Sequence, residues 1–383
     1  MDWCFNKQLH VEEMIRSVVD PIDIINLPDF DLDVTLLYEK LSQSADKVFA
    51  DNQRLIICHH DTDYYPSMST CGNTIYNLIT IIAYLDISSD HTVILANDYS
   101  GLLQKNVDKL CAIHNINTIR VIPFSLWYDY PVVNNRPFTK RYPPRHLYSF
   151  LAGVPRSHKQ TMLCALAENN LLNKGMISFQ PSHPHLSKKT FQPNNRYKEN
   201  VLPNINLRTT IPHTSRNNEN LNVSQKSKLL HIKYHKLLQS TIVHQEIEGT
   251  PVGSHTLQQQ DFLQKALIFL TTESVGNYPQ IFYTEKTWKS FSNSCALMLL
   301  ASKGSIKNLN NLGFETFHSV WDESYDTKVD CLNRAQLICQ QLMDLSKYYF
   351  DDLAHQCMPI FEHNYYHLQT FADKQLNALR EQL

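Results

Sequence analysis

The stretch "RLIICHHDTDYYPSMSTCGNTIYNLITIIAYLDISSDHTVILAND", residues 54–98, decides the fold. It contains two short apolar runs separated by a longer amphipathic segment, and the same alternation continues to residue 124. The runs at 54–61, 91–98 and 118–124 predict buried strands, and the segments at 73–85 and 102–114 predict helices. Strands that alternate with helices are typical of a parallel sheet, so the chain begins with an α/β lobe.

A second series of strands and helices follows a proline-rich stretch at 127–146. Its strands are predicted at 147–153, 175–180, 266–273 and 295–301, and its helices at 156–172, from 285 and over most of the tail. We therefore expect an α/β fold of two Rossmann-like lobes with C-terminal helices. The expected limits are 1–135 for the N-terminal lobe, 145–335 for the C-terminal lobe with a basic polar insertion at 181–225, and 336–383 for the C-terminal helices.

Composition narrows the class of protein. The 383 residues are 43% hydrophobic, with a formal net charge of -2, as in a globular protein. No apolar run long enough for a membrane span occurs, and the N-terminus lacks the layout of a signal peptide, which favours the cytoplasm. Nine cysteines without a CxxC pair argue against a disulfide framework. The absence of GxGxxG and GxxxxGK[ST] weighs against dinucleotide oxidoreductases and P-loop enzymes.

The segment "YTEKTWKSF", residues 283–291, places charged groups at the start of a predicted helix. Thr284 suits the N-cap, so that Glu285 and Lys286 fall on the first turn. Glu285 would complement the helix dipole and could pair with Lys289, as on many surface helices. Lys286 is unfavourable at that end unless an anion also binds there, and helix N-termini do bind phosphates. Ordinary capping and an anion site both remain open at this point.

The stretch that ends in these residues resembles the donor-site segment of the GT-B fucosyltransferases. In that family a strand ending in Phe-Glu-Asn is followed by a glycine-containing loop and Tyr-Val-Thr-Glu-Lys. Here Glu273 ends the strand, Gly276 lies in a slightly longer loop, and Tyr283 precedes Thr-Glu-Lys without the valine. Thr272 and Ser274 replace the flanking Phe and Asn.

The resemblance implies a fold of GT-B type and a role for each matching residue. Phage-encoded glycosyltransferase-like proteins look similar over roughly 147–335. In the family the Glu of Thr-Glu-Lys binds the nucleotide ribose and the Lys the diphosphate, which gives these roles to Glu285 and Lys286. The family also places an arginine on the diphosphate, for which Arg156 is the candidate, with Lys159 one turn further on. Glu273 and Thr284 would line the same donor site.

The first lobe supplies candidates for the catalytic base. Asp61 and Asp63 follow the strand at 54–61, where a carboxylate could deprotonate an acceptor hydroxyl, and Asp98 and Asp129 compete with them. Together with His60, the same two aspartates could instead form a metal-dependent hydrolase site. The sequence does not choose among these carboxylates.

Two further charged segments have mainly structural explanations. The acidic turn at 322–326 could attract a cation, but a solvated turn explains it, and we expect no metal site. The segment 181–240 holds ten Lys or Arg and two acids, which suits a solvated loop or a polyanion such as DNA.

We expect a glycosyltransferase that moves a hexose or pentose from a nucleotide-diphosphate sugar to a hydroxyl of a glycan or a modified nucleic acid. The resemblance favours inversion at the sugar and a reaction without a metal or other cofactor. Two alternatives come from other classes: the metal-dependent hydrolase at His60, Asp61 and Asp63, and a non-catalytic nucleic-acid-binding protein that uses the segment 181–240.

Overall fold

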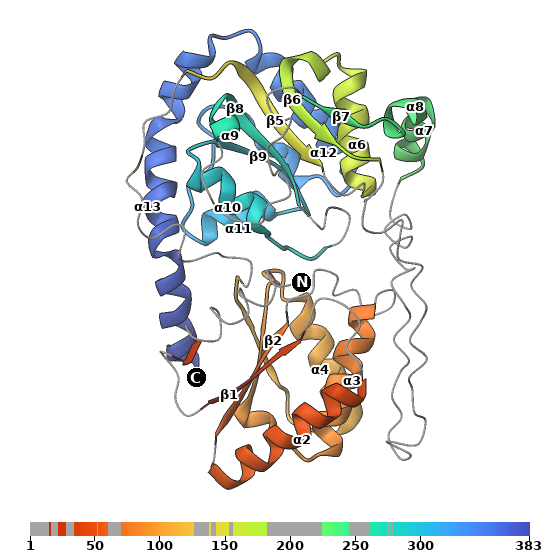
Figure 1. The fold of residues 1–383 in the computed structure, drawn as a ribbon, viewed down its shortest axis with the longest axis vertical. Coiled ribbons are helices and arrows are strands. Elements are labelled where there is room, and N and C mark those ends of the chain that lie inside the picture. Colours follow the sequence, from red (N-terminus) through yellow and green to blue (C-terminus); the bar gives the residue numbers. More distant parts are fainter. Residues whose placement is uncertain are drawn as a thin grey trace. The chain divides into compact units, whose positions relative to one another are not determined.

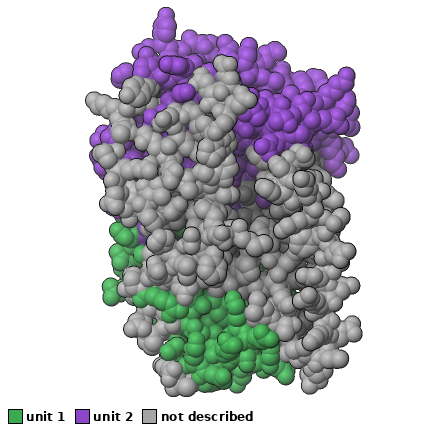
Figure 2. All heavy atoms as spheres, in the orientation of Figure 1, with its two compact units in different colours: residues 1–126, 191–218, 373–383 green, residues 127–190, 219–372 purple. Residues whose placement is uncertain are grey.

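The computed structural model describes residues 15–16, 22–27, 34–51, 53–59, 70–125, 138, 143–152, 156–181, 224–244, 261–273, 276 and 279–383. These residues form two compact units, which Figure 2 shows in two colours. The first unit contains the described residues up to 125 and Asp373–Leu383, and the second contains those from 138 to 181 and from 224 to 372. Each unit is built on its own sheet (Figure 1).

The first unit has a parallel four-stranded sheet in the order β1-β2-β3-β4. Its strands are β1 (Ile22–Leu27), β2 (Arg54–His59), β3 (Thr92–Ala96) and β4 (Arg120–Pro123). The connections contain α2 (Val34–Asp51), α3 (Thr70–Tyr84), the short 3-10 helix η1 (Ser89–His91) and α4 (Leu102–His114). Because each strand after β1 follows a helix and pairs in parallel with the preceding strand, this unit is a simple βα series.

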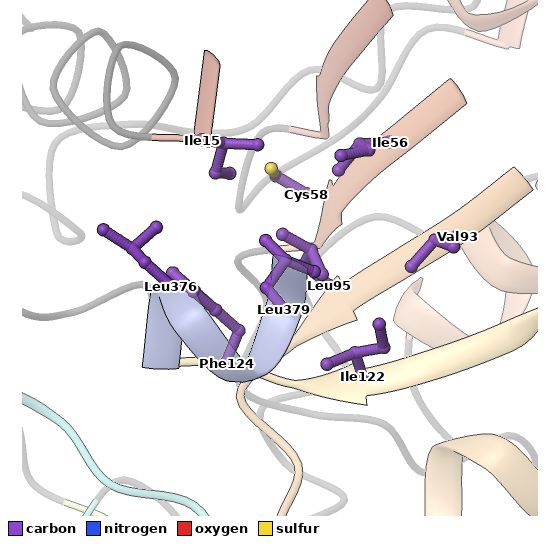
Figure 3. Close-up of a cluster of buried hydrophobic side chains, with 9 residues drawn as sticks. All are labelled: Ile15, Ile56, Cys58, Val93, Leu95, Ile122, Phe124, Leu376 and Leu379. Carbon is purple, nitrogen blue, oxygen red and sulfur yellow. The ribbon is translucent and has the colours of Figure 1, made fainter. Parts of the chain in front are cut away.

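The C-terminal end of the chain covers one face of this sheet. Alternate residues of the strands share that face, and Leu376 and Leu379 pack with them (Figure 3). The cluster comprises Ile15, Ile56, Cys58, Val93, Leu95, Ile122, Phe124, Leu376 and Leu379. The first unit is therefore completed by residues from both ends of the sequence.

The second unit has a five-stranded sheet in the order β7-β6-β5-β8-β9, parallel except for β7. Its strands are β5 (His146–Ala152), β6 (Gly175–Phe179), β7 (Ile242–Val243), β8 (Ala266–Thr272) and β9 (Ala296–Leu300). Its helices are α6 (Ser157–Glu168), η2 (Leu172–Lys174), α7 (Gln225–Lys233), α8 (His235–Leu238), α9 (Asp261–Gln264), α10 (Glu285–Ser292), α11 (Ser305–Asn311), η4 (Ser324–Thr327) and α12 (Cys331–Leu345). Helix α13 (Phe350–Gln382) begins in this unit, and its last residues belong to the first.

Packing around β8 fixes the elements that matter for the site. Every residue of β8 and of β9 is buried, as in strands that helices cover on both faces. Helix α10 is anchored by aromatic packing, with ring centroids 4.7 Å apart for Phe291 and Phe314 and 5.5 Å apart for Trp288 and Phe314. This aromatic packing fixes the position of α10, and with it the positions of the side chains on the opposite side of the helix.

The expected fold class, α/β with two Rossmann-like lobes and C-terminal helices, is confirmed. The expected limits 1–135 and 145–335 remain a prediction, whereas the residues 336–383 are divided between the units, because Asp373–Leu383 packs on the first sheet. Helices α7 and α8 follow the segment expected as an insertion and were not predicted. No helix among the described residues combines the length and apolar character needed to cross a bilayer.

Candidate functional site

The second sheet contains a point at which the strand order reverses. From β5 the chain passes through α6 to β6 on one side, whereas β8 lies on the other side of β5. The carboxyl ends of β5 and β8 therefore lie side by side, and β6, the strand that follows β5 through α6, lies on the far side of β5 from β8. In open α/β sheets this arrangement leaves room for ligands beside the helix N-termini. Helix α6 begins soon after β5, and α10 is the next helix after β8.

Glu273, directly after β8, fastens the start of α10. Its fully buried carboxylate accepts hydrogen bonds from the Thr284 N–H at 3.0 Å, the Thr284 hydroxyl at 2.6 Å and the Thr287 hydroxyl at 2.6 Å. These bonds hold the helix N-terminus next to the end of the strand. The sequence suggested that Glu273 lines the binding site of the sugar donor. In the structure its carboxylate accepts hydrogen bonds from N–H and hydroxyl groups of the protein itself.

Thr284, Glu285 and Lys286 form the first turn that the sequence predicted. Thr284 is the N-cap, and its hydroxyl oxygen accepts the Lys286 N–H at 3.3 Å. The Lys286 ammonium donates to the same oxygen at 2.9 Å and lies 3.5 Å from a carboxylate oxygen of Glu285. The Lys286 side chain is 22% exposed and that of Glu285 is 7% exposed, so the turn presents a cation and a mostly buried carboxylate together.

The start of α6 contributes two more cations. Arg156 is the N-cap of this helix, and Lys159 lies on its first turn with only 3% of its surface exposed. Burial lowers the pKa of Lys159 well below its ordinary value, and the positive charges of Lys286 and Arg156 lower it further. Glu285 and then Glu273 act in the opposite direction on this pKa. These interactions bring the N-termini of α6 and α10 into one electrostatic cluster.

His158 joins α6 to the loop after β8, a role that the sequence did not indicate. Its Nε2 lies 2.6 Å from the carbonyl oxygen of Glu273. Burial and the nearby charges of Lys159 and Arg156 lower its pKa, so the neutral ring donates from Nε2 to this carbonyl. A Cβ added to Gly276 would lie 2.8 Å from Cγ of His158, so this close approach requires glycine.

Arg334 of α12 holds the same loop from another direction. Its buried guanidinium donates hydrogen bonds to the carbonyl oxygens of Lys328, Val329 and Gly276. It thereby ties the loop between β8 and α10 to the start of α12. Sequence offered no signal for this contact, because Gly276 and Arg334 are 58 positions apart.

The acidic turn is explained by backbone hydrogen bonds. Asp322 accepts the N–H of Ser324, Glu323 accepts that of Phe317, and Asp326 accepts that of Lys307. Asp322 and Glu323 thus bind backbone within the same turn region, whereas Asp326 binds the first turn of α11. Across the described ranges, His, Cys, Asp and Glu form no group of three or more that could hold a metal ion.

Of the carboxylates that the sequence offers as a catalytic base, the structure describes only Asp98. His60, Asp61, Asp63 and Asp129 lie outside the described residues. Asp98 is buried after β3, and its carboxylate accepts the N–H groups of Ser100 at 2.9 Å and Leu103 at 2.7 Å. It therefore secures the start of α4.

The similarity of the chain to known proteins is of low degree. Neither a protein family model nor a curated protein matches the chain. A solved structure of T4 phage BGT in complex with UDP and Mn²⁺ is 10% identical, covers 94% of this chain and 98% of its own, and has a TM-score of 0.35. At this identity and TM-score the likeness does not extend to activity, and it gives no support to the fucosyltransferase-like family.

The expectation of a reaction without a cofactor is contradicted by this comparison, because the similar structure holds Mn²⁺ together with UDP. A metal-free reaction is therefore not carried forward. The finding concerns T4 phage BGT, and the described residues of this chain contain no cluster suited to a metal.

Proposed function

We propose that this protein is a glycosyltransferase that moves a sugar from a nucleotide-diphosphate sugar to a hydroxyl acceptor. The observation that carries the proposal is the cluster of Arg156, Lys159, Glu285 and Lys286 on two helix N-termini at the strand-order reversal. Such an edge suits a nucleotide with a charged phosphate group.

Each member of the cluster has a chemical part in the proposed reaction. Transfer breaks the bond between the sugar carbon and the diphosphate oxygen, and negative charge grows on the leaving diphosphate. Arg156, Lys159, Lys286 and the N–H groups of both helices would stabilise that charge. Glu285 would accept hydrogen bonds from the ribose hydroxyls. Glu273 would act as a positioning residue, because its carboxylate already binds Thr284 and Thr287.

The acceptor side of the reaction rests on the first lobe. The acceptor oxygen attacks the sugar carbon and passes its proton to a carboxylate, for which Asp61 and Asp63 are the proposed residues. The acceptor would be a glycan or a modified nucleic acid, and the reaction would invert the configuration at the sugar. These assignments follow from the sequence pattern and the resemblance described above.

Thermal unfolding with nucleotides tests the donor site. The wild-type protein would be heated with UDP, GDP, ADP and dTDP and their sugar conjugates, each with and without Mn²⁺. A ligand at about a hundred times its Kd stabilises a fold by roughly 2.7 kcal/mol, which raises the Tm measurably. We expect one nucleotide to raise the Tm of the wild type and to have little effect on Lys286→Ala.

The matched control is Lys109→Ala, which removes an exposed lysine of α4 in the other unit. It should respond to the nucleotide as the wild type does. A folded wild-type protein whose Tm no nucleotide changes, with or without Mn²⁺, would contradict the proposed function.

A surface of α7 and α8 supports a second candidate function, binding of a nucleic acid. Lys226, Lys228 and Lys236 are exposed there, and no acidic residue occurs from Gln225 to Val243. Neutralised phosphates make binding fall steeply with salt. If this function is correct, Lys226→Ala with Lys228→Ala should weaken binding of a DNA duplex and reduce its salt dependence, with no effect of nucleotide sugars.

A further inference from the structure

Lys159 is unusual among the cations of the donor cluster because it is almost completely buried. It is 3% exposed, whereas the side chain of Lys286 is 22% exposed. A charged ammonium at a buried position is costly, and lysine commonly meets this cost by losing its proton.

Among the described residues, the charged groups that act on Lys159 do not compensate a positive charge there. Lys286 and Arg156 are the cations that lower the pKa of Lys159, and Glu285 and Glu273 are the carboxylates that raise it. Glu273 already accepts three hydrogen bonds from α10 and its N-cap, and Glu285 lies next to Lys286. The adjacent His158 is buried and neutral. With every group charged, three cations would face two carboxylates.

We propose that Lys159 is a neutral amine in the empty site and takes up a proton when the diphosphate of the donor binds. The inference rests on the proposed function, since it assigns a step to the same site. Two negative charges from the diphosphate would reverse the local charge balance, and its oxygens would accept hydrogen bonds from the ammonium. Lys159 would then discriminate in favour of donors with a diphosphate over uncharged sugars and nucleosides.

The lowered pKa of Lys159 agrees with this geometry and fixes the sign of the pH dependence. Below that pKa the amine is already charged, and binding needs no proton. Above it, each binding event takes up one proton, so the affinity falls as the pH rises, by at most about tenfold per pH unit. Arg334 is another charged group near this cluster, and it lowers the pKa of His158.

Calorimetric titration measures the proton directly. The titrant would be UDP-glucose, or the nucleotide sugar of the panel above with the largest effect on Tm, because its diphosphate has no terminal phosphate that titrates near neutral pH. The heat would be compared in HEPES and Tris, which differ in ionisation enthalpy, between about pH 6 and 9. We expect the wild type to take up close to one proton in the upper part of this range, together with a weakening Kd.

Lys159→Arg is the decisive variant, because a guanidinium keeps its charge when buried. We expect it to bind the same nucleotide sugar with proton uptake near zero and a Kd almost independent of pH. Lys159→Met should bind much more weakly than either, and the exposed control Lys109→Ala should behave as the wild type.

Two results would overturn the inference while the proposed function stands. One is wild-type binding without proton uptake, and the other is full uptake in Lys159→Arg, which would assign the proton to another group such as His158. Absence of any nucleotide-sugar binding by the wild type would instead contradict the proposed function, and the inference with it.

Discussion

At the residue scale, Glu273 is the side chain on which the position of the α10 N-terminus depends. Its carboxylate accepts one N–H and two hydroxyl protons, all from α10 or its cap. A carboxylate in this role accepts every bond offered, whereas an amide presents a donor to one of the same groups. The binding of any ligand at the first turn of α10 therefore depends on Glu273, even if Glu273 does not contact that ligand.

Glu273→Gln should both destabilise the protein and weaken nucleotide binding. Leaving one buried donor without its acceptor costs about 1–3 kcal/mol in the free energy of unfolding. The measurements are the Tm and the Kd for the nucleotide. Glu315→Gln is the control, because the Glu315 side chain is 53% exposed. Unchanged stability in Glu273→Gln would refute the capping role.

Lys159 leads to a prediction about stability without ligand. Because its pKa in the folded protein lies well below the ordinary 10.5, the unfolded chain binds the proton more strongly. The folded state is therefore penalised at neutral pH, and the penalty decreases as the pH rises towards 10.5. Lys159→Met removes this penalty. We therefore expect the variant to have a higher Tm than the wild type at neutral pH, and the two Tm values to differ less near pH 10.

Each kcal/mol gained in this way raises the Tm by about 2–4 °C in a domain of 150–250 residues. Unfolding curves of both proteins across this pH range provide the test, with Lys109→Met as the exposed control. A Tm of Lys159→Met below that of the wild type at neutral pH would show that the ammonium is stabilised in the empty site. The same variant should lose nucleotide binding, so stability and function are opposed at this position.

At the element scale, local patterns predicted most strands and helices. The strand ends and caps that the site needs were visible because they depend on neighbours in the sequence: Thr284 suits an N-cap, and the apolar run before Glu273 suits a buried strand. By contrast, β1 was missed, and α7 and α8 were missed because lysines and histidines interrupt their apolar pattern.

The contacts that join these elements could not be predicted from the sequence. His158 bonds to a carbonyl 115 positions away, and Arg334 reaches Gly276 across 58 positions. Neither contact leaves a periodic or spaced signal, since it depends on which strands become neighbours in the sheet. The individual cations were recognisable, but the burial of Lys159 among them is a property of the folded unit.

The α4 helix provides a test that separates capping from catalysis. Asp98→Ala removes the acceptor for the N–H groups of Ser100 and Leu103, and loss of such a cap costs about 0.5–2 kcal/mol. We expect a lower Tm for the variant, whereas Asp90→Ala, which removes an exposed carboxylate in the same unit, should leave it unchanged. A fall in turnover of about 10²–10⁴-fold with unchanged stability would instead identify Asp98 as a general base.

At the scale of the whole molecule, the two units share the C-terminal helix. The residues of α13 up to 372 belong to the second unit, and Asp373–Leu383 belongs to the first. Within the first unit, Gln375 accepts the Ser125 N–H at 3.4 Å and donates to the Tyr99 hydroxyl at 3.1 Å. The sheet formed by the early part of the sequence is thus finished by its last residues.

A chain that ends at Ala372 should therefore lose the fold of the first unit. The truncation uncovers the apolar face in Figure 3, where Leu376 is 7% and Leu379 is 0% exposed. Calorimetry should show loss or a large fall of one unfolding transition, with the transition of the second unit retained. In the full chain, Leu379→Ala should cost about 2–5 kcal/mol, whereas Leu229→Ala, at a position 66% exposed, should cost little. If the shortened chain unfolded as the full one does, the C-terminal residues would be dispensable, and the first sheet would be stable without this cover.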